Sequence, residues 1–125
     1  MPDTPMRDKA TIAVVDDDES VRTALNSLLR SSGYEVRTYC GAMEFLVSKA
    51  PAQTHCLVCD IQMPGMSGIE LHQHLLEQGW RIPTLFITAY PQLAANVPGL
   101  VACLPKPCDG NNLLACIDVA LRQSH

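Results

Sequence analysis

The run Cys56-Leu57-Val58-Cys59-Asp60 is apolar until its last residue, and the loop Ile61-Gln62-Met63-Pro64-Gly65-Met66-Ser67-Gly68 follows it. A short apolar run bounded by turn residues is typical of a buried strand. A single carboxylate at the end of such a strand is costly to bury unless a partner neutralises its charge. The function of the chain therefore depends on what lies around Asp60.

Three more apolar runs of this kind and one short strand-like segment with weak alternation, Glu35–Tyr39, lie along the chain, and helix-like segments separate them. We expect the strands at Thr11–Val15, Glu35–Tyr39, Cys56–Asp60, Pro83–Thr88 and Leu100–Leu104. We expect the helices after Asp16–Glu19 as far as Gly33, over Gly41–Lys49 with Pro51 closing it, from about Gly68 to Gln78, and after the capping residue Asp109. Strands that alternate with helices predict an α/β fold, in which helices cover both faces of one parallel sheet.

The length of 125 residues fits one domain, with a flexible leader at 1–10, the domain at 11–122 and a tail at 123–125. Hydrophobic residues make up 47% and charged residues 18% of the chain, which is typical of a globular protein. The net charge of −4 disfavours direct binding of nucleic acid. The chain has neither an apolar run of about 18 residues nor a signal peptide, so we expect a cytoplasmic protein without a membrane partner.

Six cysteines are present, and no secretion signal accompanies them, so we expect reduced thiols. Cys56 and Cys59 are three residues apart on a predicted strand, which points their side chains to opposite faces. One tetrahedral metal ion is therefore unsuited to bind both. We predict that these thiols act as small hydrophobic residues of the core.

Polar residues close four of the predicted strands. Asp16 and Asp17 end the first strand, Asp60 the third and Thr88 the fourth, and Lys106 follows the fifth. Parallel strands place their carboxyl ends at one edge of the sheet, where ligands bind. Carboxylates with water typically hold Mg²⁺, and an ammonium group suits a phosphate. The set predicts phosphoryl transfer with Asp60 as the nucleophile.

Each of these residues also has an ordinary structural explanation. An acidic run commonly caps a helix, a threonine favours a strand, a lone lysine is usually solvated, and a lone aspartate often begins a turn. Taken one at a time, these explanations are preferred, and only the shared edge favours a phosphoryl-transfer site. His72 and His74 are two apart on a predicted helix and do not face each other, so we expect no joint metal site there.

Four motifs, in this order, resemble those of response-regulator receiver domains, the phosphoacceptors of two-component signalling. They are Val14-Val15-Asp16-Asp17-Asp18, Asp60-Ile61-Gln62-Met63-Pro64-Gly65-Met66-Ser67-Gly68-Ile69-Glu70-Leu71, Thr88-Ala89 and Lys106-Pro107. The resemblance covers about residues 11–122. It implies a flavodoxin-like, doubly wound sheet of five strands in the order 2-1-3-4-5.

The resemblance also implies a metal site and a phosphorylation site. Asp60 would take the phosphoryl group from a histidine kinase or a phosphotransfer protein. Asp17 would be the main ligand of Mg²⁺, and Asp16 would support it, often through water. Asp60 itself and the backbone carbonyl of Gln62 would complete the protein's share of the metal ligands.

Two further residues would bind the phosphoryl group itself. The resemblance implies that Thr88 bonds this group, that Lys106 pairs with it, and that a cis bond before Pro107 places the lysine inward. The protein is then expected to be a Mg²⁺-dependent switch and not an enzyme for external substrates. Its output would be an output domain or a downstream protein, in the style of helix-turn-helix transcription regulators.

The chain departs from the family pattern in the region that usually reads out phosphorylation. Cys103 stands where receivers usually carry an aromatic residue, and Cys108 replaces the aromatic that commonly follows Lys-Pro. Thr88 and Lys106 are only 18 positions apart, shorter than usual by about one helical turn. We therefore expect a shortened fourth helix within Tyr90–Gly99, where Pro91 and Pro98 allow about two turns at most. Dimerisation through this face stays an open question.

Three other functions stay open at this point. A pseudo-receiver would bind partners without phosphorylation, and Cys103 together with the short helix favours it. A thiol-based redox sensor is favoured only by the number of cysteines. A flavin carrier is disfavoured, because the acidic strand ends repel a flavin phosphate.

Overall fold

The structure is a computed structural model and describes residues 10–94, 97 and 100–123. Most of the predicted leader (1–9) and the end of the predicted tail (124–125) lie outside the described residues. The strands are β1 (Thr11–Val15), β2 (Glu35–Tyr39), β3 (Cys56–Asp60), β4 (Thr84–Thr88) and β5 (Leu100–Pro105). They form one parallel sheet in the order β2-β1-β3-β4-β5, which confirms the predicted α/β fold and its flavodoxin-like strand order.

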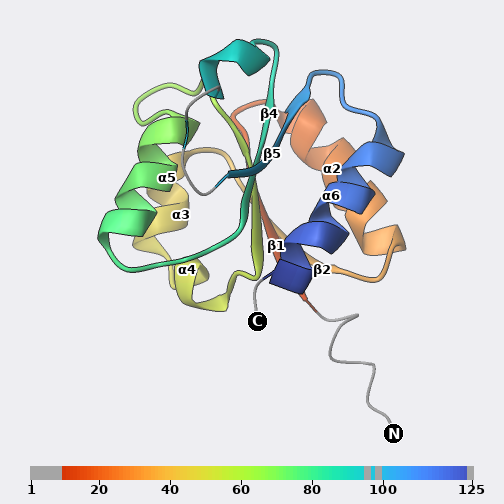
Figure 1. Cartoon of the computed structure of the whole chain (residues 1–125), viewed down its shortest axis with the longest axis horizontal. Helices are drawn as coiled ribbons and strands as arrows, with labels where there is room; N and C mark the ends of the chain where they lie inside the picture. The colour runs from red at the N-terminus through yellow and green to blue at the C-terminus, as the bar shows by residue number, and fades with distance from the viewer. Residues whose placement is uncertain (1–9, 95–96, 98–99, 124–125) are drawn as a thin grey trace, which may run out of the picture.

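Helices cover both faces of this sheet (Figure 1). They are α2 (Glu19–Ser31), α3 (Ala42–Val47), α4 (Ala50–Gln53), α5 (Gly68–Glu77) and α6 (Gly110–Gln123), and a short 3-10 helix, η1 (Pro91–Ala94), follows β4. Helices α3, α4 and α5 lie on one face of the sheet, and α2 and α6 lie on the other. Within the described residues, no helix combines the length and the apolar character needed to cross a membrane.

The predicted turn residues end or begin these helices. Gly33 follows α2 with a φ of 97°, and Gly79 follows α5 with a φ of 86°. Glycine adopts this left-handed conformation without steric cost, so both helices end where the sequence indicated. Asp109 caps α6, because its Oδ1 atom accepts a hydrogen bond from the N–H of Asn111 at 2.9 Å.

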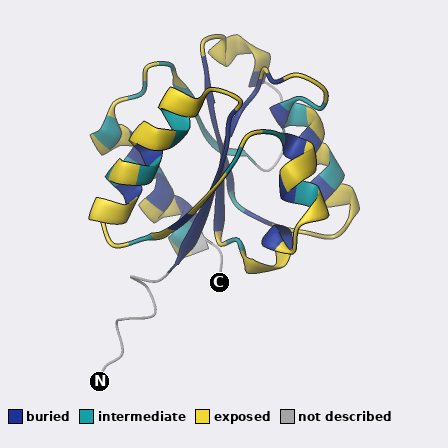
Figure 2. Ribbon diagram, turned by 180° about the vertical axis from the view of Figure 1, so that it is seen from behind, coloured by how far each residue is buried: buried dark blue, intermediate teal, exposed yellow. Residues whose placement is uncertain are grey.

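Each face of the sheet has its own hydrophobic core. Cys59 packs with Phe45 in the core on the α3 and α5 side, whereas Cys56 packs with Leu29 in the core on the α2 and α6 side. Figure 2 shows the strands buried and the outer surfaces of the helices exposed. The two thiols therefore point to opposite faces, as predicted, and all six cysteines are free.

One predicted helix is wrong, and two strand ends differ from the prediction by one residue, because β4 begins at Thr84 and β5 ends at Pro105. We expected a single helix over Gly41–Lys49, closed by Pro51, but α3 ends at Val47, and Pro51 lies in the first turn of α4. Proline suits that turn, because the amide hydrogen it lacks would have no helical partner there. Ser48 stabilises the break between the two helices, because its Oγ atom accepts a hydrogen bond from the N–H of Ala50, the first residue of α4, at 3.0 Å.

The connection between β4 and β5 contains η1 in its described part, and residues 95–96 and 98–99 lie outside the described residues. The pairing of the two strands is irregular at one place, between Thr84 and Leu85. From Leu85 onward the pairing is regular, and it ends with Thr88 opposite Pro105. The irregularity therefore lies at the end of the strand pair that is remote from Thr88.

Candidate functional site

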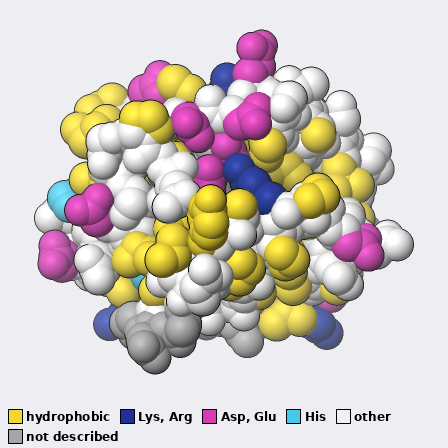
Figure 3. Space-filling model, turned by 90° about the horizontal axis from the view of Figure 1, so that it is seen from above, with side chains coloured by type: hydrophobic (Ala, Val, Ile, Leu, Met, Phe, Trp, Pro, Cys, Tyr) yellow, Lys and Arg dark blue, Asp and Glu magenta, His cyan; other side chains and the backbone are white. Residues whose placement is uncertain are grey.

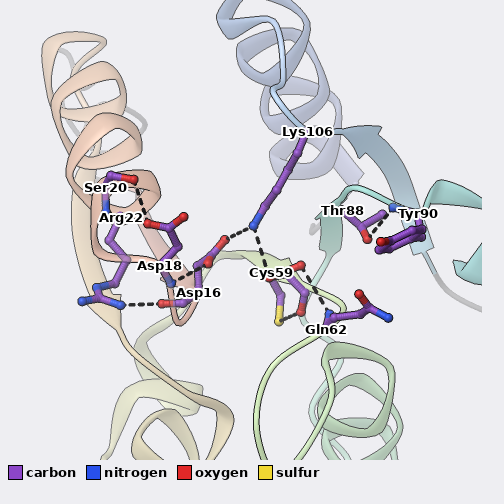
Figure 4. A network of polar contacts seen from close by, with 10 residues as sticks. Asp16, Asp18, Ser20, Arg22, Cys59, Gln62, Thr88, Tyr90 and Lys106 are labelled. Atoms are coloured by element: carbon purple, nitrogen blue, oxygen red, sulfur yellow. Dashed lines mark hydrogen bonds and ion pairs between the residues drawn. The ribbon is translucent and has the colours of Figure 1, made fainter.

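Three of the predicted site residues meet at the carboxyl edge of the sheet. Asp60 is the last residue of β3, Asp16 follows β1, and Lys106 follows β5. The Nζ atom of Lys106 lies 2.9 Å from Oδ2 of Asp16 and 3.2 Å from Oδ2 of Asp60 (Figure 4). Figure 3 shows this edge from above, with acidic side chains gathered beside a basic one and hydrophobic side chains around them. One lysine thus serves as the counter-ion of two buried carboxylates.

Asp16 is held at each of its polar atoms. Its N–H donates to the carbonyl of Tyr39 at 3.1 Å, and its own carbonyl accepts a hydrogen bond from Nη1 of Arg22 at 2.7 Å. Its Oδ1 atom accepts from the N–H of Asp18 at 2.9 Å, and Oδ2 pairs with Lys106. Only 2% of its surface is exposed, so Asp16 is a fixed part of the edge.

The acidic run after β1 serves two purposes. Asp18 caps α2, because its Oδ1 atom accepts hydrogen bonds from the backbone N–H and the hydroxyl of Ser20, at 2.9 and 2.7 Å. These hydrogen bonds lower the pKa of the Asp18 carboxyl group. The helix-capping explanation is therefore right for Asp18, whereas Asp16 and Asp17 belong to a carboxylate cluster with Asp60.

This cluster fits the metal ion that the resemblance implies. Asp17 is exposed, and one carboxylate oxygen from each of Asp16, Asp17 and Asp60 lies within 4.8 Å of the other two. Carboxylate oxygens are the hard ligands that Mg²⁺ prefers in proteins. Gln62 stands beside them, because its N–H donates to Oδ1 of Asp60 at 3.3 Å. Metal binding by the Gln62 carbonyl stays a prediction.

The electrostatics of Asp60 and Lys106 reflect their shared burial. Desolvation raises the pKa of Asp60 and the negative charge of Asp16 raises it further, which the hydrogen bond from Lys106 offsets only in part. Desolvation acts to lower the pKa of Lys106, but its interactions with Asp16 and then Asp60 outweigh this effect and raise it. Two repelling carboxylates therefore share one cation, and a divalent ion would relieve their repulsion.

Thr88 joins the site through β4. It is fully buried, and its Oγ1 atom accepts a hydrogen bond from the N–H of Tyr90 at 3.0 Å, which leaves the hydroxyl proton to be donated elsewhere. The carbonyl of Thr88 accepts a hydrogen bond from the N–H of Lys106 at 2.9 Å. The bond between Lys106 and Pro107 is cis, as the resemblance implied. Thr88 and the lysine are thus tied together through the backbone.

Two further residues support the site and were not predicted to do so. Arg22 holds the carbonyl of Asp16, and the Sγ atom of Cys59 donates to the carbonyl of Asp60 at 3.2 Å. An arginine in the first turn of a helix resembles any solvated side chain in sequence, and Cys59 was interpreted only as a core residue. Neither position carries a local signal that would have identified its role.

The two unusual cysteines lie in different surroundings. Cys103 contacts η1, since its Sγ atom lies 3.8 Å from the carbonyl oxygen of Pro91. Cys108 lines a mostly apolar cavity of about 380 Å³ between α2 and the segment that contains Lys106. Neither of these departures from the family pattern therefore replaces a residue of the predicted site.

Comparison with known proteins identifies the family. The family described as the response regulator receiver domain matches residues 12–118. The chain belongs to this family and is a receiver domain of a response regulator, as the motifs predicted.

Curated relatives are transcriptional regulators. The chain is 37% identical over 116 residues to the transcriptional regulatory protein TdiR of Thauera aromatica, covering 90% of this chain and 51% of TdiR. It is 36% identical over 123 residues to the transcriptional regulatory protein FixJ of Bradyrhizobium diazoefficiens, covering 95% of this chain and 60% of FixJ. The chain therefore spans about half the length of the curated relatives it matches.

Solved structures share the same fold. The response regulator StyR matches with a TM-score of 0.85 and 45% identity, over 93% of this chain and 61% of StyR. The response regulator TrrA of Thermotoga maritima, solved in complex with Mg²⁺ and BeF, matches with a TM-score of 0.81 and 24% identity, over 90% of this chain and 99% of TrrA. At that identity, the likeness to TrrA shows the fold alone.

Proposed function

We propose that Asp60 accepts a phosphoryl group from a phosphohistidine of a histidine kinase or of a phosphotransfer protein. The observation that carries this proposal is the 3.2 Å contact between Oδ2 of Asp60 and Nζ of Lys106, within a cluster of three carboxylates. In the transfer, an oxygen of Asp60 forms a bond to phosphorus while the bond between phosphorus and the histidine nitrogen breaks.

The neighbours of Asp60 would then act on the phosphoryl group. Lys106 would pair with its negative charge, and the hydroxyl of Thr88 would donate a hydrogen bond to one of its oxygens. Asp16, Asp17, Asp60 and the carbonyl of Gln62 would hold Mg²⁺. When bound, this ion would neutralise charge on the transferring oxygens. TrrA, a response regulator protein of the same fold, was solved in complex with Mg²⁺ and BeF, which supports a Mg²⁺ site in this fold.

We further propose that phosphorylation controls transcription through an output domain or a downstream protein, in the cytoplasm. The relatives TdiR and FixJ support this proposal, because both are described as transcriptional regulatory proteins. The net charge of −4 disfavours direct binding of nucleic acid by this chain. The protein would assist its own phosphorylation and dephosphorylation without turning over external substrates.

The test is incubation with acetyl phosphate and Mg²⁺, followed by intact mass spectrometry. We expect a gain of one phosphoryl group in the wild type and none in Asp60→Asn. A matched control is Asp118→Asn, which removes an exposed carboxylate of α6 that pairs with Arg122 at 3.3 Å; this variant should be phosphorylated normally. A wild type that gains no mass, or an Asp60→Asn variant that gains the same mass, contradicts the proposal.

A further inference from the structure

Arg22 connects the first turn of α2 to the end of β1. Its Nη1 atom donates to the carbonyl of Asp16 at 2.7 Å, and Figure 4 shows the side chain reaching from the helix towards that residue. We propose that Arg22 is a positioning residue, which fixes the backbone at Asp16 and so the carboxylates of Asp16 and Asp17 for Mg²⁺. This inference rests on the proposed function, because it concerns the metal ligands of the same site.

The turn between β1 and α2 is short. β1 ends at Val15 and Asp18 already caps α2, so only Asp16 and Asp17 join the strand to the helix. Arg22 contacts this turn through its side chain, because its guanidinium group binds the carbonyl of Asp16, while its backbone N–H makes an ordinary helical hydrogen bond to the carbonyl of the capping residue Asp18 at 3.1 Å. A hydrogen bond from a charged donor is stronger than a neutral one. The side chain of Arg22 thus fixes the two-residue turn from the helix side.

The side chain of Arg22 makes a hydrogen bond to the backbone and not an ion pair. In the described part of the chain, no carboxylate oxygen lies within 4.0 Å of a nitrogen of Arg22, so the backbone carbonyl is its hydrogen-bond acceptor. The two possible roles of the residue predict opposite effects on the metal. If Arg22 acted only as a nearby positive charge, its removal would strengthen the binding of Mg²⁺, because like charges repel. If it positions the turn, its removal weakens that binding.

The same helix provides a matched control in Arg30. Its Nη2 atom donates to the carbonyl of Val36 in β2, also at 2.7 Å, so it makes the same kind of bond between α2 and a strand. Arg30 also contacts Asn26, and none of these partners belongs to the carboxylate cluster. A purely structural effect of losing an arginine from α2 should therefore appear equally in variants of Arg30.

The test is a titration of the full chain with Mg²⁺, in which isothermal calorimetry and NMR of the backbone amides measure the binding affinity. Urea denaturation measures the stability of each variant. We expect Arg22→Met to weaken the binding of Mg²⁺ about five- to tenfold, which corresponds to the loss of one hydrogen bond. We expect the affinity of Arg30→Met for Mg²⁺ to stay within about twofold of the wild type. Arg22→Lys should recover part of the loss, because an ammonium group can still donate to the Asp16 carbonyl. Stability should fall by similar amounts in the two methionine variants.

The outcomes separate this inference from the proposed function. A wild type that does not bind Mg²⁺ contradicts the proposed metal site itself. If the wild type binds Mg²⁺, then binding that is unchanged or tighter in Arg22→Met overturns the positioning role alone. An equal loss in Arg30→Met also overturns it. If Arg22→Met does not fold, the comparison of Arg22→Lys with Arg30→Lys decides, and the inference requires a loss of more than about twofold in the first only.

Discussion

The backbone of Gly68 lies directly against the carbonyl group of Asp60, so that a Cβ atom at Gly68 would stand 2.2 Å from the carbonyl oxygen. The N–H of Gly68 donates to the carbonyl of Ile61 at 2.8 Å, which folds the loop back onto the end of β3. We expect Gly68→Ala to lower the free energy of unfolding by about 1–3 kcal/mol, because the methyl group forces backbone atoms apart. Urea denaturation measures this change.

The control for this substitution is Gly41→Ala. Among the described residues, a Cβ atom at Gly41 would meet only Oε1 of Glu44, at an ordinary distance of 3.6 Å, and the backbone there is extended. We expect the free energy of unfolding to change by less than about 0.5 kcal/mol. Equal effects of the two substitutions would show that the approach of Gly68 to Asp60 does not constrain the loop.

Lys106 is the only side-chain cation in contact with the two buried carboxylates among the described residues. We expect Lys106→Met to slow phosphorylation by acetyl phosphate by about 10²-fold, the usual cost of removing one preorganised donor from a transferring group. The rate of mass gain measures it. Lys49→Met, which changes an exposed lysine just before α4, should retain the wild-type rate. A normal rate in Lys106→Met would contradict the proposed pairing with the phosphoryl group.

Asp60→Asn should stabilise the metal-free protein at neutral pH. Burial raises the pKa of Asp60, so the folded state binds this proton more tightly than the unfolded state does. The ionised carboxylate therefore reduces stability as the pH rises through the interval between the usual aspartate pKa and the raised value, and below that interval the penalty is absent. The stability difference between Asp60→Asn and the wild type should thus shrink as the pH falls.

Urea denaturation with a chelator present measures the stability of Asp60→Asn and of the wild type at neutral and at acidic pH. The asparagine keeps an oxygen that can accept the hydrogen bond from Gln62, so the comparison chiefly removes charge. A variant that is less stable than the wild type at neutral pH would show that the pair with Lys106 outweighs the cost of burial.

The buried cysteines should resist alkylation in the folded protein. Burial raises the pKa of Cys56 to about 12 and raises that of Cys59 well above its usual value. The reactive thiolate is then rare, and no reagent reaches the sulfur atoms without opening the fold. We expect iodoacetamide to label neither residue under native conditions and both in denaturant, as peptide mass spectrometry would show. Native labelling of Cys56 or Cys59 would contradict the core role and would favour the redox alternative.

The elements that could be predicted are those with a pattern in the sequence itself. The run Cys56–Asp60 and three of its counterparts are apolar and bounded by turn residues, so these strands followed from the residues directly, whereas Glu35–Tyr39 showed only weak alternation. The strand order did not, and it came from the resemblance. The carboxylates and Lys106 could be assigned to one edge because parallel strands end together.

The features that could not be predicted arise from contacts between residues with neutral local patterns. Arg22 looks like any first-turn arginine until the fold places its guanidinium group on Asp16. The break between α3 and α4 depends on the hydroxyl of Ser48, because Pro51 permits either the end or the start of a helix. Sequence alone also gives no sign that the register between β4 and β5 slips between Thr84 and Leu85.

This register irregularity bears on which part of the domain can vary in length. A change in the length of the connection between β4 and β5 can be accommodated near Thr84, because the pairing beside Thr88 and Pro105 does not depend on it. The backbone hydrogen bond from Lys106 to Thr88 lies at the opposite end of the strand pair from this irregularity. A connection of different length between β4 and β5 would therefore leave Thr88 and Lys106 at the carboxyl edge of the sheet.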